Sequence, residues 1–71
     1  MNDLMLFLLA IEGAKIYSLE EYPNETVYMF FNGESEYTVV SEDQIEDTIR
    51  EEKALGYDLT LAGKFYNGKV A

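Results

Sequence analysis

An Asn-Gly pair at residues 32–33 separates two stretches in which successive side chains alternate between two faces. Asn-Gly is the preferred pair of the tight type I′ turn, which joins neighbouring antiparallel strands. In residues 25–31 both sets of alternating side chains are largely apolar or aromatic, as expected for a strand covered on both faces. The sequence therefore predicts a β-hairpin over residues 25–40 whose first strand is central in a sheet.

A helix is predicted directly after the hairpin, over residues 41–56. Ser41 and Gln44 have the spacing of a capping box, in which each side chain bonds a free backbone N–H group. Ile45 begins an apolar seam along the helix. Gly56 can adopt the left-handed conformation that ends a helix. The signals at both ends and the apolar seam all predict a helix, so a helix is expected to follow the hairpin.

Residues 4–11 form an uninterrupted apolar run near the start of the chain. A helix is favoured there because Leu, Met and Ala are strong helix formers, with Asn2 and Asp3 as caps and Gly13 as its end. A buried strand is the alternative. Residues 14–21 are expected to form a weak strand. Because so small a domain cannot cover a helix that is apolar all round, the excess predicts a dimer or partner interface, or a poorly covered core helix.

The last part of the chain adds a predicted strand over residues 57–62, interrupted by Gly63, and a second Asn-Gly pair at residues 67–68. That pair makes either a small terminal hairpin or a tail laid on the sheet edge. The expected order is α-β-β-β-α-β, with room for a short final strand. Residues 1–71 are expected to form one small α+β domain, an antiparallel sheet of about three to five strands carrying two helices on one face.

The chain contains no cysteine and no histidine, which removes the thiolate nucleophile, the disulfide and the commonest general base. No nucleophile elbow, glycine-rich phosphate loop or zinc motif occurs. Asp43, Glu46 and Asp47 share a predicted helical face, but the spacing of a calcium-binding loop is missing. We therefore expect a protein that is not an enzyme and has no catalytic residue, cofactor or dedicated metal site.

Fourteen acidic residues stand against five basic ones, giving a formal net charge of −9. Such a field opposes direct binding to nucleic acid or to an anionic membrane and favours basic protein surfaces. The alternative is that acidity serves only solubility. The start of the chain lacks the pattern of a secretory signal, and the apolar run is too short to span a bilayer. A cytoplasmic location is expected.

The acidic residues with the clearest pattern lie on the outer side of the predicted helix and near the tip of the hairpin. Glu46 and Arg50 are spaced for one favourable i,i+4 pair. The other charged pairs at this spacing along the acidic side are acid with acid, and they repel each other. If tip and helix lie on one side of the molecule, their carboxylates form an array of negative points, as the phosphates of nucleic acid do. The predicted partner-binding residues are Glu34, Glu36, Glu42, Asp43, Glu46, Asp47 and Glu51.

Residues 32–42, with the sequence NGESEYTVVSE, lead into the acidic helix. This passage resembles the hairpin-to-helix passage of some small acidic phage anti-CRISPR proteins, whose short first helix also precedes strands. The resemblance implies a nucleic-acid mimic that acts in the host cytoplasm and occludes the DNA-reading surface of a Cas nuclease. Its contacting positions would be Glu34, Glu36, Glu42, Asp43, Glu46 and Asp47. The strand expected over residues 57–62 departs from that family, in which a further helix follows.

Two hypotheses of different classes result. The first is a phage-type inhibitor that binds the basic nucleic-acid-binding surface of a defence or DNA-handling protein. The alternative is a small homo-oligomeric interaction or accessory module that uses residues 4–11, with acidity serving only solubility. Loss of binding at high salt would favour the first, and concentration-dependent self-association would favour the second.

Overall fold

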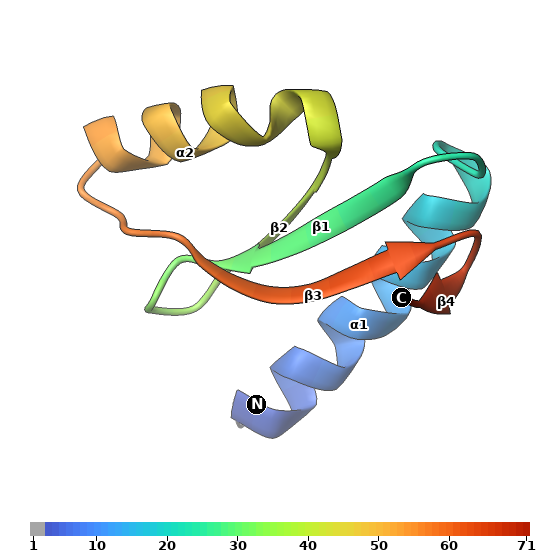
Figure 1. Ribbon diagram of the computed structural model, residues 1–71. Helices are drawn as coiled ribbons and strands as arrows, with labels where there is room; N and C mark the ends of the chain where they lie inside the picture. The colour runs from blue at the N-terminus through green and yellow to red at the C-terminus, as the bar shows by residue number, and fades with distance from the viewer. Residues whose placement is uncertain (1–2) are drawn as a thin grey trace.

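The computed structural model describes residues 3–71 and contains two α-helices, one short 3₁₀ turn and one four-stranded antiparallel sheet (Figure 1). The sheet order is β2-β1-β3-β4, so β1 is central, as predicted. The α+β class with an antiparallel sheet and two helices is confirmed. The elements are α1 (Asp3–Glu20), β1 (Thr26–Phe31), β2 (Tyr37–Ser41), η1 (Glu42–Gln44), α2 (Ile45–Ala54), β3 (Thr60–Tyr66) and β4 (Lys69–Val70).

The first helix, α1, is longer than predicted. The expected end at Gly13 and the expected strand over residues 14–21 are both wrong, since α1 continues to Glu20 and the first strand of the predicted order is absent. Gly13 does not adopt a positive φ and costs the helix only about 1 kcal/mol relative to alanine. Packing of the following turns against the sheet outweighs that cost. The predicted cap residue Asn2 lies outside the described residues.

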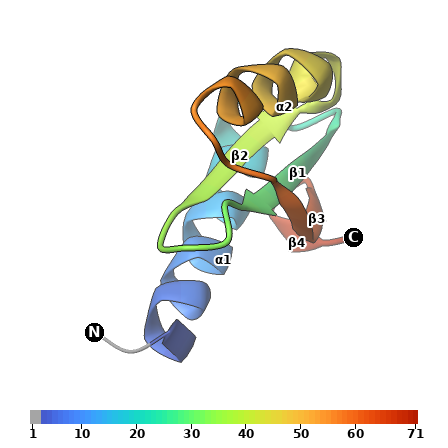
Figure 2. The ribbon, with the colours of Figure 1, turned by 90° about the vertical axis from the view of Figure 1, so that its left-hand side faces the viewer.

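The core lies between α1 and one face of the sheet. Ala14 of α1 is fully buried together with Val27, Met29 and Phe65, which come from β1 and β3. Figures 1 and 2 show α2 on the other side of the sheet, so the expectation of both helices on one face is wrong. The reason is the central strand, which is apolar on both faces and needs cover on each. Phe30 is nearly buried on the side away from α1.

The two Asn-Gly pairs form different turns. The predicted type I′ turn at residues 32–33 is wrong, because the loop spans residues 32–36 and only Gly33 of the pair has a positive φ. The buried Asn32 carboxamide oxygen instead accepts three backbone N–H bonds, of 2.9, 3.1 and 3.1 Å, from residues 34–36. At residues 67–68 both φ values are positive, at 50° and 83°, as a type I′ turn requires. The terminal hairpin therefore forms, and its return strand is β4.

The strand β3 runs through Gly63 instead of stopping there. Met29 pairs with Gly63 and Phe30 with Leu61, which leaves one extra residue on β3 as a β-bulge. A Cβ at Gly63 would come within 3.2 Å of the Phe65 ring, so glycine leaves room for that core side chain. The expected strand start at residue 57 is also wrong, because pairing with β1 begins at Thr60.

The second helix, α2, ends as the sequence predicts. Gly56 has a φ of 94°, its N–H bonds the carbonyl of Lys53 at 3.0 Å, and the Tyr57 N–H bonds the carbonyl of Glu52 at 2.9 Å. These two bonds are the pair that defines a Schellman C-cap. The start is different: residues 42–44 form the 3₁₀ turn η1, and the α-helix begins at Ile45. The acidic segment is therefore two short elements joined end to end.

Candidate acidic interaction surface

The seven predicted partner-binding residues are all exposed, and they fall into two groups. Glu42 and Asp43 lie in η1, and α2 carries Glu46, Asp47 and Glu51. We call these five residues the η1–α2 acidic surface. The second group is Glu34 and Glu36, in the loop between β1 and β2.

The strand β2 separates the two groups. Glu36 precedes β2 and Glu42 follows it, so they are about 20 Å apart along the strand. Because α2 runs back above the sheet, its C-terminal end lies at the same end of the sheet as the loop (Figures 1 and 2). The loop therefore lies at the end of the sheet to which α2 returns, and η1 lies at the other end. The five residues of the η1–α2 acidic surface are contiguous in the chain, and the loop pair forms a separate acidic point.

Glu42 is held in place by a tyrosine from the central strand. The Tyr28 hydroxyl donates a hydrogen bond of 3.0 Å to Glu42 Oε1. The ammonium of Lys64, which is opposite Tyr28 in the sheet register, lies 5.9 Å from the centroid of the Tyr28 ring. The bond to the Glu42 carboxylate raises the pKa of Tyr28, because loss of the phenolic proton would break it. A tyrosine of β1 therefore orients one exposed carboxylate of η1.

Asp43 is held by the residue that was expected to cap the helix. The Ser41 hydroxyl donates a bond of 2.6 Å to Asp43 Oδ1 and makes no bond to a backbone N–H of the helix. The predicted capping box with Gln44 is therefore wrong. The hydroxyl of Ser41, which is 1% exposed, fixes a surface carboxylate instead. Adjacent carboxylates at positions 42 and 43 are thus both oriented by neighbours inside the fold.

Further along α2, the carboxylates are less constrained. Arg50 pairs with Asp47 at 3.1 Å, so the expected pair of Arg50 with Glu46 is wrong. Both partners are more than 70% exposed, and such a pair adds little stability. Within residues 3–71 it is the only ion pair of the η1–α2 acidic surface. The negative field of this surface is therefore largely uncompensated.

Sequence reasoning did not find the roles of Tyr28, Lys64 and Ser41. The capping-box pattern predicted that the Ser41 hydroxyl bonds a backbone N–H group of the helix, not the Asp43 carboxylate. Tyr28 and Lys64 are 36 positions apart in the chain, and only the register of β1 with β3 brings them together. No local signal in the sequence carries that register, because the β-bulge on β3 shifts it by one residue.

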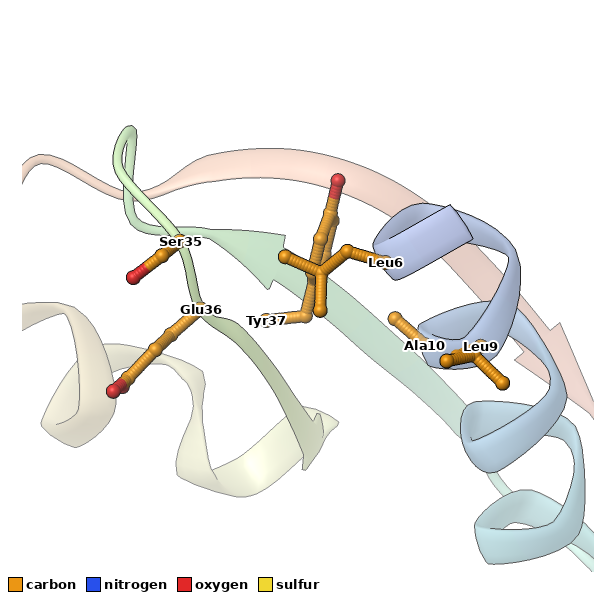
Figure 3. Close-up of a pocket in the computed structure, with 6 residues that line it drawn as sticks. All are labelled: Leu6, Leu9, Ala10, Ser35, Glu36 and Tyr37. Carbon is orange, nitrogen blue, oxygen red and sulfur yellow. The ribbon is translucent and has the colours of Figure 1, made fainter. Parts of the chain in front are cut away.

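An open groove of about 390 Å³ lies beside Glu36, between α1 and the loop (Figure 3). Leu6, Leu9 and Ala10 form its helical side, and the ring of Tyr37 lies opposite. The Tyr37 ring packs against two other rings, with centroid distances of 5.9 and 4.8 Å. Ser35 and Glu36 complete the lining, but Figure 3 shows the Glu36 side chain extending away from Leu6, Leu9 and Tyr37. The groove is therefore open and partly polar, and its apolar part is formed by α1 and Tyr37.

Among residues 3–71, no group of three or more acidic, histidine or cysteine side chains is arranged to hold a metal ion. No helix in this part of the chain combines the length and hydropathy needed to cross a membrane. Comparison of the chain with protein-family models, curated proteins and solved structures finds no match.

Proposed function

We propose that this protein is a non-enzymatic acidic binding protein that occludes the basic nucleic-acid-binding surface of a defence or DNA-handling protein, as a phage-type inhibitor does. The observation that carries the proposal is the pair Glu42 and Asp43. Both carboxylates are exposed, and both are fixed by hydrogen bonds from residues of the sheet. Carboxylates held in one orientation lose less conformational entropy when they bind arginine or lysine, so more of the interaction energy appears as affinity.

The distribution of charge favours a partner with an extended basic surface rather than one with a single basic residue. The η1–α2 acidic surface presents five carboxylates, and the loop adds two more at the other end of β2. A DNA-binding channel contains lysines and arginines spaced to meet successive phosphates. Several carboxylates spread over a similar length can occupy such a channel and exclude DNA, whereas one ion pair could not.

The test is capture of nucleic-acid-binding proteins from the source cell, at low and high salt, with duplex DNA as competitor. A variant with Glu42, Asp43, Glu46 and Asp47 all changed to lysine should lose capture, and wild-type capture should fall steeply with salt. The matched control changes Glu20, Glu21, Glu25 and Asp58 to lysine, which are all exposed and lie outside the η1–α2 acidic surface. The control has the same net charge as the variant and should retain most binding.

Two results would contradict the proposal. If both quadruple variants lose capture equally, only the net charge matters and the arrangement at η1 and α2 does not. If neither variant changes capture, the acidic residues serve solubility, and another surface binds whatever is retained.

A further inference from the structure

The helix α1 lies along one face of the sheet, and its other side is not covered by any helix or strand of residues 3–71 (Figures 1 and 2). Six large apolar side chains on this helix are between 48% and 64% exposed: Leu4, Met5, Leu8, Leu9, Ile16 and Leu19. The buried residues of α1 are Ala14, which is part of the core, and Ser18, which accepts a hydrogen bond from the Gly68 N–H. The exposed side chains are thus in excess of what the sheet can cover. Ile16 and Leu19 belong to this exposed face only because α1 continues beyond Gly13, and Leu19 at its end also lies beside Gly68 in the turn between β3 and β4.

The spacing of these residues indicates what kind of partner fits them. At about 100° per residue, all six lie within an arc of about 140°. Met5, Leu9, Glu12, Ile16 and Leu19 follow one another at intervals of four, three, four and three. This spacing matches that of a coiled-coil seam, with Glu12 as its one polar position, and it fits another helix lying alongside. A sheet edge or a small ligand would not need that spacing.

The charge on this face indicates which helix. Within this arc of α1 (Asp3–Glu20) the only charged side chains are Glu12 and Lys15. They have opposite signs and form an ion pair, with Lys15 Nζ 3.4 Å from Glu12 Oε1. The face is therefore neutral, although the whole chain has a formal charge of −9. A basic partner gains nothing by binding here. A second copy of the chain, repelled at its acidic surfaces, can approach closely across a neutral apolar face.

We propose that α1 packs against α1 of a second copy in an antiparallel, two-fold symmetric pair. In a parallel pair the two Glu12 side chains would meet in one layer of the seam, and like charges would repel. In an antiparallel pair Glu12 can instead approach Lys15 of the partner. Each copy brings the same six apolar side chains, as a two-fold contact requires. A contact limited to one 18-residue helix is the size of a weak dimer, not an obligate one.

This inference is independent of the proposed function, because it uses a different face and a different force. The test is sedimentation of the full chain from about 1 µM to about 1 mM, the range in which weak homodimers form. The expected result is a shift from monomer to dimer mass. The variant Leu8→Glu/Ile16→Glu should remain monomeric throughout. The control Gln44→Glu/Ala54→Glu adds the same charge at exposed positions of η1 and α2, and should still dimerise.

Circular dichroism establishes that the variants are folded. If Leu8→Glu/Ile16→Glu does not fold, the neutral variant Leu8→Gln/Ile16→Gln takes its place, and its dissociation constant should rise by about tenfold or more because apolar contact area is lost. A wild-type protein that stays monomeric at the highest concentration overturns the inference. So does a folded variant that dimerises as well as wild type, because the dimer would then use another face.

Discussion

The two helices lie on opposite sides of the same sheet, and their exposed sides have opposite chemistry. The helix α1 exposes six large apolar side chains, whereas η1 and α2 expose five carboxylates. The buried sides differ as well. Ala14 of α1 is fully buried in the core, but no residue of α2 is buried. The helix α1 therefore completes the core, whereas α2 mainly carries charge.

A consequence is that the two surfaces should respond oppositely to salt. Screening weakens attraction between the η1–α2 acidic surface and a basic partner. The same screening reduces repulsion between two copies that each have a charge of −9, while apolar contact across α1 is unaffected or strengthened. Salt therefore separates the two proposals experimentally, since one association falls as the other rises.

The largest expected effect comes from the core beneath α1. Met29 is fully buried there, and Met29→Ala should reduce the free energy of unfolding by about 2–5 kcal/mol. A chain of this length has a total stability of about 4–11 kcal/mol, so the variant should be close to unfolding. Urea denaturation followed by circular dichroism measures the change.

The matched variant in α2 is Ile49→Ala, at a side chain that is 39% exposed. It should cost only about 1 kcal/mol, since much of the side chain is already in water. If the two variants lower the free energy of unfolding equally, packing of α2 supports the fold as strongly as packing of α1. The inference that α2 mainly carries charge would then be wrong.

The next effect tests how α1 is tied to the end of the chain. The Ser18 hydroxyl is fully buried, donates to the carbonyl of Lys15 and accepts the Gly68 N–H, both at 2.9 Å. Ser18→Ala should cost about 1–3 kcal/mol, because the Gly68 N–H loses its acceptor. Hydrogen exchange at Gly68 should speed up more than exchange in β1. Ser35→Ala, at an exposed loop position, is the control and should change stability by less than about 0.5 kcal/mol.

Much of the fold follows from local patterns in the sequence. The aromatic and apolar alternation of residues 26–31 predicts the central strand, and Gly56 predicts the end of α2. Where prediction was wrong, contacts distant in the chain decide. Gly13 resembles a helix stop, but the contact of Ala14 with the sheet continues the helix. Asn32 resembles half of a tight turn, but its carboxamide organises a wider loop.

The candidate site could be predicted only in part. The exposure of the seven acidic residues follows from their place on a helix surface and a loop. Their spacing does not, because it depends on the length of β2 and on the direction in which α2 returns across the sheet. The hydrogen bond to Glu42 depends on how β1 is placed beside η1. The bond to Asp43 comes from Ser41, which was expected to cap the helix instead.

A smaller effect should have opposite signs for stability and for binding. Asp47 and Glu51 are one turn apart in α2, and such like charges destabilise a helix slightly. Glu51→Lys replaces that repulsion with attraction and should raise the free energy of unfolding by a few tenths of a kcal/mol. The same variant should weaken capture of a basic partner. Thermal unfolding and the capture assay measure the two changes.

The control for this prediction is Glu25→Lys, which makes the same charge change at an exposed position between α1 and β1. It removes no like-charge pair within a helix, so any gain in stability should be smaller. If Glu51→Lys leaves capture of the basic partner unchanged, position 51 is outside the functional part of the η1–α2 acidic surface. If it does not raise the free energy of unfolding, the repulsion between Asp47 and Glu51 does not destabilise α2.

The smallest effect concerns the bond that orients Glu42. Because the carboxylate accepts from the Tyr28 hydroxyl, the pKa of Tyr28 lies above the ordinary tyrosine value of 10.0. The contribution of this bond to stability is therefore present below pH 10 and is lost as the pH rises through the raised pKa. NMR titration of the Tyr28 ring should give a lower pKa in Glu42→Gln than in wild type, since the neutral amide does not oppose ionisation as a carboxylate does. The same titration of Tyr17, whose pKa is raised chiefly by burial on the α1 side, should be unchanged in that variant. If the pKa of Tyr28 is the same in both proteins, the Tyr28 hydroxyl does not hold the Glu42 carboxylate in solution. The η1–α2 acidic surface would then lack the fixed pair of carboxylates at positions 42 and 43 that distinguishes it from a solvated acidic helix.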